Sequence, residues 1–453
     1  MQDTPTFDTI EQAKKQLREL TPPQLLILSY LFLAVLGTIL LKLPASTTQP
    51  LTWMQALFTS VSASTITGLV VVDTGTHFTM FGQIVLLILI QAGGLGLMTF
   101  GVFLVHLTRG DLSLGNRIAV GDALNQTGQS DMRRLLRWLF GFTFVAEAIG
   151  TALLALHWVP ELGWSRGWYV SFFHAVSAFN NAGFALAPDS LTAYVGNSLV
   201  IGVISLLFIS GSIGFIVVAD MMAKRHFREY SLHTKLMLVG TIVVNVVAML
   251  VLLVLEFGNP ATLGDLPDLG SKLWGAWFQA VTPRSSGFNS TDTAGLLPAS
   301  AFFIMGLMFI GGGSGSTGGG IKLSTFIVLL LATRTFFWRQ ERPVIFGRSL
   351  SQAVVIKALA ITVVSLFFAM TGTFLLVLIE PSHAFLDLAF EAVSAAATVG
   401  LSRGVTASLS DLGMFILVVL MLIGRVGPLT LVFLIAHKKG DRIRYPEGQV
   451  NVG

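Results

Sequence analysis

The phrase Phe58-Thr59-Ser60-Val61-Ser62, which Gly68 follows, decides the fold because close copies of it recur three times along the chain. Each copy has the form Phe-x-x-Val-Ser/Thr, and a glycine follows the valine by seven residues in copies one, two and four and by six in copy three. The other copies are Phe173-His174-Ala175-Val176-Ser177 before Gly183, Phe278-Gln279-Ala280-Val281-Thr282 before Gly287, and Phe390-Glu391-Ala392-Val393-Ser394 before Gly400. Glycine-to-glycine spacings of 115, 104 and 113 residues indicate four structural repeats of similar length.

The composition indicates a protein whose surface largely faces lipid. Of the 453 residues, 53% are hydrophobic and only 11% are charged, whereas soluble domains carry about 25% charged residues. So few charges cannot keep the surface of so long a chain in water. The sequence contains no cysteine, which excludes disulfides, iron–sulfur clusters and the usual thiolate zinc site.

Eight apolar stretches are long enough to cross a bilayer as helices, each of which needs about 20 residues. They lie at about 23–42, 79–105, 135–158, 195–220, 235–256, 300–332, 353–380 and 411–437. We expect an all-α integral membrane fold with eight transmembrane helices and four half-membrane pore helices. These form four helix–pore loop–helix repeats with fourfold pseudosymmetry around one pore. The expected divisions are a cytoplasmic N-terminal segment (1–22), repeat 1 (23–106), repeat 2 (107–222), repeat 3 (223–334), repeat 4 (335–437) and a cytoplasmic C-terminal tail (438–453).

The positive charges predict the orientation in the membrane. The two terminal segments and the connections near 106–137, 221–235 and 334–357 hold 21 of the 28 lysines and arginines. This side is therefore expected to be cytoplasmic, in a multi-pass protein of the inner (plasma) membrane. The net charge of +4 then follows from topology, so no nucleic-acid partner is expected.

Each repeated phrase predicts a short helix that enters the membrane from outside and stops midway. Its C-terminal end carries partial negative charge and favours a cation. The residues after it leave helical geometry, so their carbonyls are free to replace the hydration shell of an ion. The predicted filter has three residues from each repeat: Ile66-Thr67-Gly68, Asn181-Ala182-Gly183, Ser285-Ser286-Gly287 and Thr398-Val399-Gly400. No carboxylate lies among them, and Thr398-Val399-Gly400-Leu401 is close to the Thr-Val-Gly-Tyr phrase of potassium-channel filters.

These four degenerate one-glycine loops, with the glycine-rich stretch in the third repeat, resemble the Trk/Ktr family of potassium transporters. With eight spans rather than ten, and by its length, the chain resembles the KtrB-type membrane subunits of Ktr systems. The resemblance implies sodium-dependent potassium uptake by a homodimer, with potassium as substrate at the filter carbonyls and sodium as activator or co-ion. It also implies a cytosolic ring of KtrA-type subunits that binds ATP or ADP and NAD(H), and no organic cofactor in this chain.

A glycine-rich stretch interrupts the sixth predicted span. It reads Gly311-Gly312-Gly313-Ser314-Gly315-Ser316-Thr317-Gly318-Gly319-Gly320. Each glycine costs about 1 kcal/mol against alanine in a helix, so a continuous helix is not expected. We interpret the stretch as an intramembrane gating loop, which agrees with the family resemblance; close helix packing through small residues is the other interpretation. A phosphate-binding loop fits poorly, because Ile321 separates Gly320 from Lys322.

Polar residues inside the predicted spans are further candidates. Arg425 is expected to project into the permeation path beneath the filter, as its family counterpart does, or else to pair with an acid on another helix. Glu147 is expected to bind sodium or, as we favour, to pair with a basic residue. The residues after each repeated phenylalanine are polar and could support the filter from behind by hydrogen bonds, with Arg284 as a partner for Glu391.

Two rival classes fit the sequence less well. A secondary transporter of another small solute would have two inverted halves with broken helices, whereas these repeats are parallel. A membrane-embedded enzyme would need converging acids, histidines or a metal motif, and no such pattern stands out.

Overall fold

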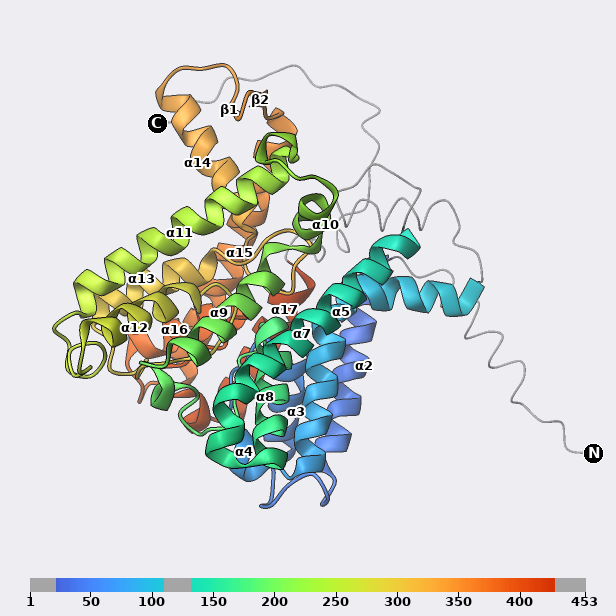
Figure 1. Cartoon of the computed structure of the whole chain (residues 1–453), viewed down its shortest axis with the longest axis vertical. Helices are drawn as coiled ribbons and strands as arrows, with labels where there is room; N and C mark the ends of the chain where they lie inside the picture. Colours follow the sequence, from blue (N-terminus) through green and yellow to red (C-terminus); the bar gives the residue numbers. More distant parts are fainter. Residues whose placement is uncertain (1–21, 110–131, 428–453) are drawn as a thin grey trace, which may run out of the picture.

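The computed structural model describes residues 22–109 and 132–427, and this part of the chain is almost entirely helical (Figure 1). One order of elements occurs four times: a long helix, a short helix, a loop and a further helix. The first set is α2 (Pro22–Lys42), α3 (Trp53–Ser64), α4 (Thr74–His77) and α5 (Met80–Arg109). The second set is α7 (Met132–Leu162), α8 (Trp164–Phe179), η1 (Thr192–Tyr194), α9 (Ser198–Ile213) and α10 (Phe215–Ala223).

The third and fourth sets have the same order. The third comprises η2 (Phe227–Glu229), α11 (Leu232–Glu256), α12 (Leu269–Val281), α13 (Pro298–Phe309) and α14 (Leu323–Phe337). A two-stranded antiparallel hairpin of β1 (Val344–Ile345) and β2 (Arg348–Ser349) follows. The fourth comprises α15 (Gln352–Ile379), α16 (Phe385–Ala396), η3 (Thr406–Ser408) and α17 (Asp411–Val426).

The four short helices α3, α8, α12 and α16 are the ones that carry the repeated phrase. Side chains cap the N-terminal ends of two of them: Thr52 forms a capping box with Gln55 at α3, and Asp268 accepts hydrogen bonds from Ser271 at α12. A hydrogen bond from the Ser271 hydroxyl lowers the pKa of Asp268, which keeps this cap ionised. Each short helix stops a few residues before its glycine.

The repeated phenylalanines anchor the short helices. Phe58, Phe173, Phe278 and Phe390 are all fully buried. Each lies in a different hydrophobic cluster, and each cluster includes residues of the preceding set of helices, the fourth set preceding the first. In the same cyclic order, α3 packs on α17, α8 on α5, α12 on α9 and α16 on α13. The repeated phrase is therefore the packing element that joins one set to the next.

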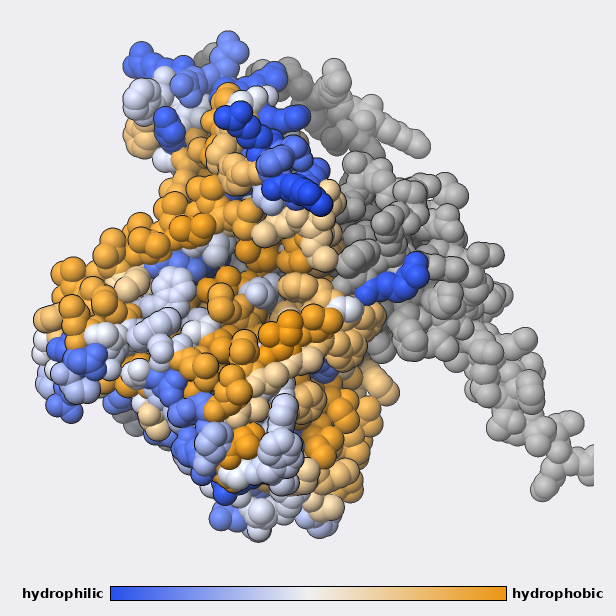
Figure 2. All heavy atoms as spheres, viewed as in Figure 1, coloured by the Kyte–Doolittle hydropathy of each residue, from blue (hydrophilic) through white to orange (hydrophobic). Residues whose placement is uncertain are grey.

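Helices occur in all eight predicted spanning stretches, although not all of them are continuous. Among the described residues, α2, α7, α11 and α15 are long and apolar enough to cross a membrane by length and composition, and the bent pair α9–α10 makes a fifth if counted as one span. The outer surface agrees with this: Figure 2 shows a broad hydrophobic band, with hydrophilic residues gathered above it around the β1–β2 hairpin and again along the lower edge. Large apolar side chains such as Leu156, Val254 and Phe302 are more than half exposed.

The prediction of a continuous helix over 195–220 is wrong. The chain bends by 92° between α9 and α10, at Gly214, whose φ is +96°. The glycine-rich stretch causes the break, because Phe215 N donates to Gly315 O and a Cβ at Gly214 would lie 2.6 Å from Ser314 O. The predicted interruption of the sixth span is confirmed, since α13 ends at Phe309 and α14 begins at Leu323.

Replacing Phe278 with alanine should destabilise the protein by about 2 kcal/mol or more, mainly through the cavity left in a close-packed cluster. Phe302→Ala is the matched control, because Phe302 is 72% exposed on the apolar surface. Thermal unfolding of the purified protein in detergent measures both. Equal losses for the two variants would contradict the assignment of Phe278 to the packing core.

Candidate functional site

The loops that follow the four short helices meet at one place. We name residues 65–68, 180–183, 284–287 and 397–400 the central loops. A Cβ built on the glycine of each central loop would lie within 3 Å of a backbone oxygen in the next loop: Gly68 faces Ala182 O, Gly183 faces Ser286 O, Gly287 faces Val399 O, and Gly400 faces Thr67 O. These contacts close a ring of four glycines in chain order.

The backbone of the central loops repeats in all four. The residue two positions before each glycine has positive φ, with values of 52° at Ile66, 59° at Asn181, 79° at Ser285 and 49° at Thr398. The glycines have φ values of 90°, 70°, 78° and 92° in the same order. Non-glycine residues seldom adopt this conformation, and it persists only where the surroundings enforce it. Such strain recurring at four equivalent positions makes the central loops the candidate functional site.

Hydrogen bonds from the central loops run back to the short helices. The amide before the glycine donates to a carbonyl at the end of the repeated phrase: Thr67 to Ser62, Ala182 to Ser177 and Val399 to Ser394, each at 2.8 Å. In the third loop, which is one residue shorter, Ser286 N donates to Thr282 O at 3.0 Å. The amides of Gly68 and Gly400 also donate to the hydroxyls of Ser62 and Ser394.

The carbonyl oxygens on the ring are left without donors. Thr67 O, Ala182 O, Ser286 O and Val399 O accept no hydrogen bond within the described part of the chain. These are the same four oxygens that face the next glycine. Buried backbone carbonyls nearly always accept a hydrogen bond. A set of unpaired carbonyl oxygens that face one ring is therefore suited to coordinate a cation.

The glycine-rich loop, residues 310–322, lies directly against the central loops. Gly319 N donates to Ser285 Oγ at 2.6 Å, and Asn181 Nδ2 donates to Thr317 Oγ1 at 2.5 Å. Gly319 also packs on Ala397 and Thr398 so closely that a Cβ there would collide with both. The structure thus brings the predicted gate residues against three of the four central loops.

Arg425 of α17 joins the glycine-rich loop to the first set of helices. Its guanidinium donates to Thr317 O and to Gly93 O, both at 2.6 Å, and to the Tyr30 hydroxyl at 3.0 Å. The side chain is 6% exposed, and within the described residues its partners are carbonyl and hydroxyl oxygens rather than carboxylates. The alternative interpretation of Arg425, pairing with an acid on another helix, is therefore not seen in this part of the chain.

A cavity of about 200 Å³ borders the same region. It is lined by the glycine-rich loop, including Lys322, by Arg425 and its neighbours, and by residues of α5, α7 and α9. Lys322 donates to Gly318 O at 2.6 Å, within the loop itself. Two basic side chains thus lie beside the cavity, where they bring positive charge close to any cation that enters it.

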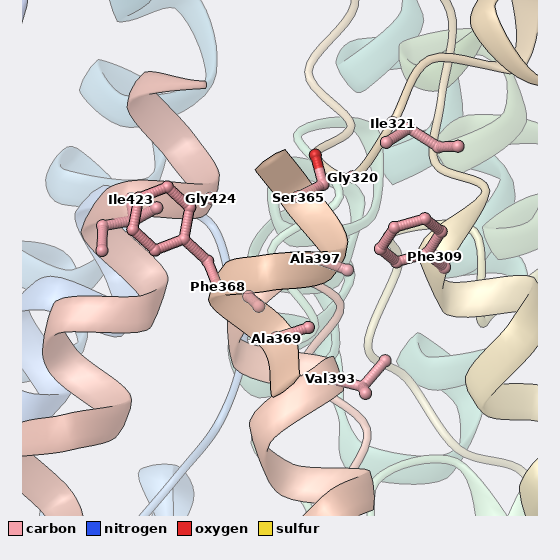
Figure 3. Close-up of a pocket in the computed structure, with 11 residues that line it drawn as sticks. Phe309, Gly320, Ile321, Ser365, Phe368, Ala369, Val393, Ala397, Ile423 and Gly424 are labelled. Atoms are coloured by element: carbon pink, nitrogen blue, oxygen red, sulfur yellow. The ribbon is translucent and has the colours of Figure 1, made fainter. Parts of the chain in front are cut away.

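The two ends of the glycine-rich loop pair with each other and also pack against apolar side chains. Figure 3 shows Phe309 and Ile321 beside a small cavity, which residues of α15, α16 and α17 complete. Its volume is about 20 Å³. Backbone pairing between Ile310 and Ile321 brings the ends together. The middle of the loop is bound by hydrogen bonds to α9 and Arg425, whereas the ends are bound mainly to each other.

Two expectations, which concern three buried polar side chains, need correction. Arg284 does not pair with Glu391; its Nη1 donates to Asn245 Oδ1 at 2.9 Å. Glu391 accepts from residues of its own repeat instead. Glu147 has no basic partner among the described residues, and accepts from Asn180 Nδ2 at 3.1 Å and from Gln91 Nε2 at 3.5 Å.

Tyr30, Gly93 and the pair of Gln91 and Asn180 were not predicted from the sequence. The doublet Gly93-Gly94 in an apolar stretch was the available signal, because small residues allow close approach inside membrane helices. A Cβ at Gly93 would collide with Ser64 O, at the end of α3. Tyr30 and Gln91 carry polar groups within apolar spans, and only the fold shows what these groups contact.

The architecture defines a class of protein: a helical membrane protein with a ring of unpaired carbonyls at its centre. The family model for TrkH, described as a cation transport protein, matches residues 8–444. The chain is similar to the Ktr system potassium uptake protein B of Bacillus subtilis (strain 168), at 49% identity over 96% of this chain and 97% of that protein. It is also similar to the protein of the same name from Vibrio alginolyticus, at 43% identity over 95% of each.

A more distant relative is the potassium/sodium uptake protein NtpJ of Enterococcus hirae, at 35% identity over 97% of this chain and 99% of that protein. The crystal structure of the potassium transporter TrkH from Vibrio parahaemolyticus matches with a TM-score of 0.74, at 18% identity, over 92% of this chain and 86% of that one. That match shows the fold. This chain belongs to the TrkH/Ktr family of cation transport proteins.

Replacing Asn245 with leucine should destabilise the protein by about 1–3 kcal/mol, because it leaves the buried Arg284 guanidinium without a partner. The double variant Asn245→Leu with Arg284→Met is the control and should recover most of the loss, since neither polar group then stays buried alone. Thermal unfolding in detergent measures both. A double variant as unstable as Asn245→Leu would show that the contact does not account for the effect.

Proposed function

We propose that this chain takes up potassium across the cell membrane through one pore, and that the central loops are its selectivity filter. The observation that carries the proposal is the ring of four unpaired carbonyl oxygens, Thr67 O, Ala182 O, Ser286 O and Val399 O. Carbonyl rings replace the water around a dehydrating cation, and the C-terminal ends of α3, α8, α12 and α16 add partial negative charge. The names of the relatives support potassium as the substrate.

The filter residues in this proposal are the twelve predicted from sequence: Ile66, Thr67, Gly68, Asn181, Ala182, Gly183, Ser285, Ser286, Gly287, Thr398, Val399 and Gly400. Their side chains are almost entirely buried and none is acidic, so the ion would contact backbone oxygen. This favours a monovalent cation over a divalent one, for which rings of carboxylates are usual.

We also propose that the glycine-rich loop and Arg425 form the gate. The loop lies against the central loops, and the Arg425 guanidinium holds its middle through Thr317 O. Its many glycines allow more than one backbone path, and the cavity beside it offers room. A fixed positive charge at this place would raise the barrier for potassium until the loop and Arg425 move.

The topology we propose is eight crossings, with four pore helices arranged with fourfold pseudosymmetry and both termini in the cytoplasm. The cyclic packing of each short helix on the preceding set supports the symmetry. Exposed arginines on the β1–β2 hairpin and beside it support a cytoplasmic location of that end. A secondary transporter of another solute is the weaker reading, because the four sets recur in the same order rather than as inverted halves.

Three further parts of the proposal rest on the relatives. Sodium would act as activator or co-ion, which the name of NtpJ supports. A homodimer and a cytosolic KtrA-type ring that binds ATP or ADP and NAD(H) would complete a Ktr system, which the names of the Ktr relatives support. The direct experiment is potassium uptake in a transporter-deficient cell, with and without external sodium and a KtrA-type partner. If neither this chain alone nor this chain with a KtrA-type partner restores potassium uptake, the proposed function is contradicted.

Gly287→Ser and Gly183→Ser should each lower the selectivity for potassium over sodium by about tenfold, equivalent to about 1.4 kcal/mol. A Cβ at Gly183 would lie 2.8 Å from Gly287 Cα and 2.9 Å from Ser286 O, so the ring must shift. Gly163→Ser is a matched control, because Gly163 also has positive φ (83°) but nothing within 4 Å of its Cβ position. Competition between the two ions in uptake assays gives the ratio. Selectivity unchanged in both ring variants would remove the filter assignment.

Deleting residues 313–317 should give potassium flux without the cytosolic partner, because it removes Thr317 and its bonds to Arg425 and Asn181. Arg425→Gln should raise basal flux to a smaller extent, since it leaves the loop in place. Flux into liposomes measures both, with the thermal transition of each purified variant as the folding control. Loss of transport in a well-folded deletion variant would contradict the gate.

A further inference from the structure

The residue that follows each repeated phenylalanine lies behind its central loop. These four residues are Thr59, His174, Gln279 and Glu391, each at most 6% exposed. Three of them make the same kind of contact, to the segment that leads outward from the glycine of their own loop. Each of these three short helices is therefore bonded to its central loop at two places. The amide before the glycine bonds back to the helix, which we call the inner side of the loop, and this side chain bonds to the segment after the glycine, which we call the outer side.

The strength of the outer contact differs between repeats. His174 donates from Nδ1 to Val170 O, so its Nε2 accepts from Leu186 N, at 3.5 Å. Gln279 Nε2 donates to the Thr291 hydroxyl. Thr59 Oγ1 is buried and has no hydrogen-bond partner among the described residues, so the first loop lacks this contact.

Glu391 makes the most extensive contact of the four. Its Oε1 accepts from the Ser402 hydroxyl at 2.5 Å and from Arg403 N at 3.1 Å, and its Oε2 accepts from the Thr406 hydroxyl at 2.7 Å. Both carboxylate oxygens are occupied and the side chain is fully buried, so Glu391 is placed to hold the loop rather than to bind an ion.

A second carboxylate on the same face of α16 extends this contact. Asp387, one turn before Glu391, accepts from Arg403 Nε at 2.6 Å. Arg403 Nη1 then donates to Thr293 O at 3.2 Å and Leu296 O at 3.4 Å, which follow the third central loop. The outer segments of the third and fourth loops are therefore connected through α16.

We propose that Glu391 is a positioning residue that fixes the outer side of the fourth central loop and thereby sets the preference for potassium over sodium. The proposal rests on the filter assignment of the previous section. Thr398 and Gly400 hold positive φ on either side of Val399 O, and such strain needs support from both ends of the loop. Ser394 supports the inner end and Glu391 the outer end. Without the outer support, the carbonyls can approach the smaller sodium ion.

The experiment measures the apparent affinities for potassium and sodium, and the maximal uptake rate, in a transporter-deficient cell. Glu391→Leu should lower the selectivity ratio about tenfold with a smaller change in maximal rate. Glu391→Gln should retain part of the selectivity, because it keeps one acceptor oxygen. Thr59→Val, at the equivalent position without a partner, should leave the ratio unchanged.

Ser402→Ala and Thr406→Val test the same contact from the loop, outside the pore helix, and serve if Glu391→Leu does not fold. Each should lower the ratio by less than Glu391→Leu. Combining Ser402→Ala with Glu391→Leu should add nothing, because both remove one contact. Full additivity, an unchanged ratio in the loop variants, or an equal effect of Thr59→Val would overturn the inference.

Gly287→Ser, measured in parallel, separates this inference from the filter assignment. If Gly287→Ser lowers the ratio and the Glu391, Ser402 and Thr406 variants do not, the positioning role alone is overturned. If Gly287→Ser also has no effect, the filter assignment is overturned and the positioning role with it.

Discussion

Backbone that leaves helical geometry inside a membrane must find partners for its polar groups, and this constraint governs the centre of the protein. The four short helices end just before the central loops, and an amide in each central loop donates to a carbonyl of the short helix that precedes it. That arrangement satisfies the donors and leaves the carbonyls on the ring unpaired. Three groups of residues maintain this arrangement. The repeated phenylalanines fix the short helices, the ring glycines allow the loops to approach closely, and the side chains behind the loops hold the strained backbone.

The four sets of helices share one arrangement but differ in their loops and polar contacts. The third central loop is one residue shorter, so its amide bonds one position closer along the helix than in the others. The glycine-rich loop comes from the third set alone, and Arg425 from the fourth. Tyr30 and Gly93, which accept the other hydrogen bonds of the Arg425 guanidinium, belong to the first set. The contacts that we propose to control flux thus link sets that the sequence separates by hundreds of residues.

Much of the fold follows from the sequence because the signals are local. Apolar length locates helices in all eight stretches, the repeated phrase locates the four short helices, and the glycine run locates the interruption between α13 and α14. The break at Gly214 was missed because no proline or charged residue lies within five residues of it, and glycine is common in membrane helices. What breaks the helix there is the glycine-rich loop, a hundred residues later.

Polar partners were harder to predict, because their choice depends on which helices become neighbours. Arg284 was expected to pair with Glu391 by charge, yet Asn245 is the residue within its reach. Glu391 was correctly placed behind the central loop, but its partners Ser402 and Thr406 lie in a segment with no distinctive pattern. A residue type predicts that a buried polar group needs a partner, whereas only the packing identifies it.

The most direct test of the central claim is the position of a heavy potassium analogue in the protein. Anomalous diffraction from crystals grown with rubidium or thallium(I) locates the ion without reference to transport. Our account predicts density on the axis between the carbonyl oxygens of Thr67, Ala182, Ser286 and Val399. Density only elsewhere, for example beside the carboxylate of Glu147, with none between these four oxygens, would contradict it.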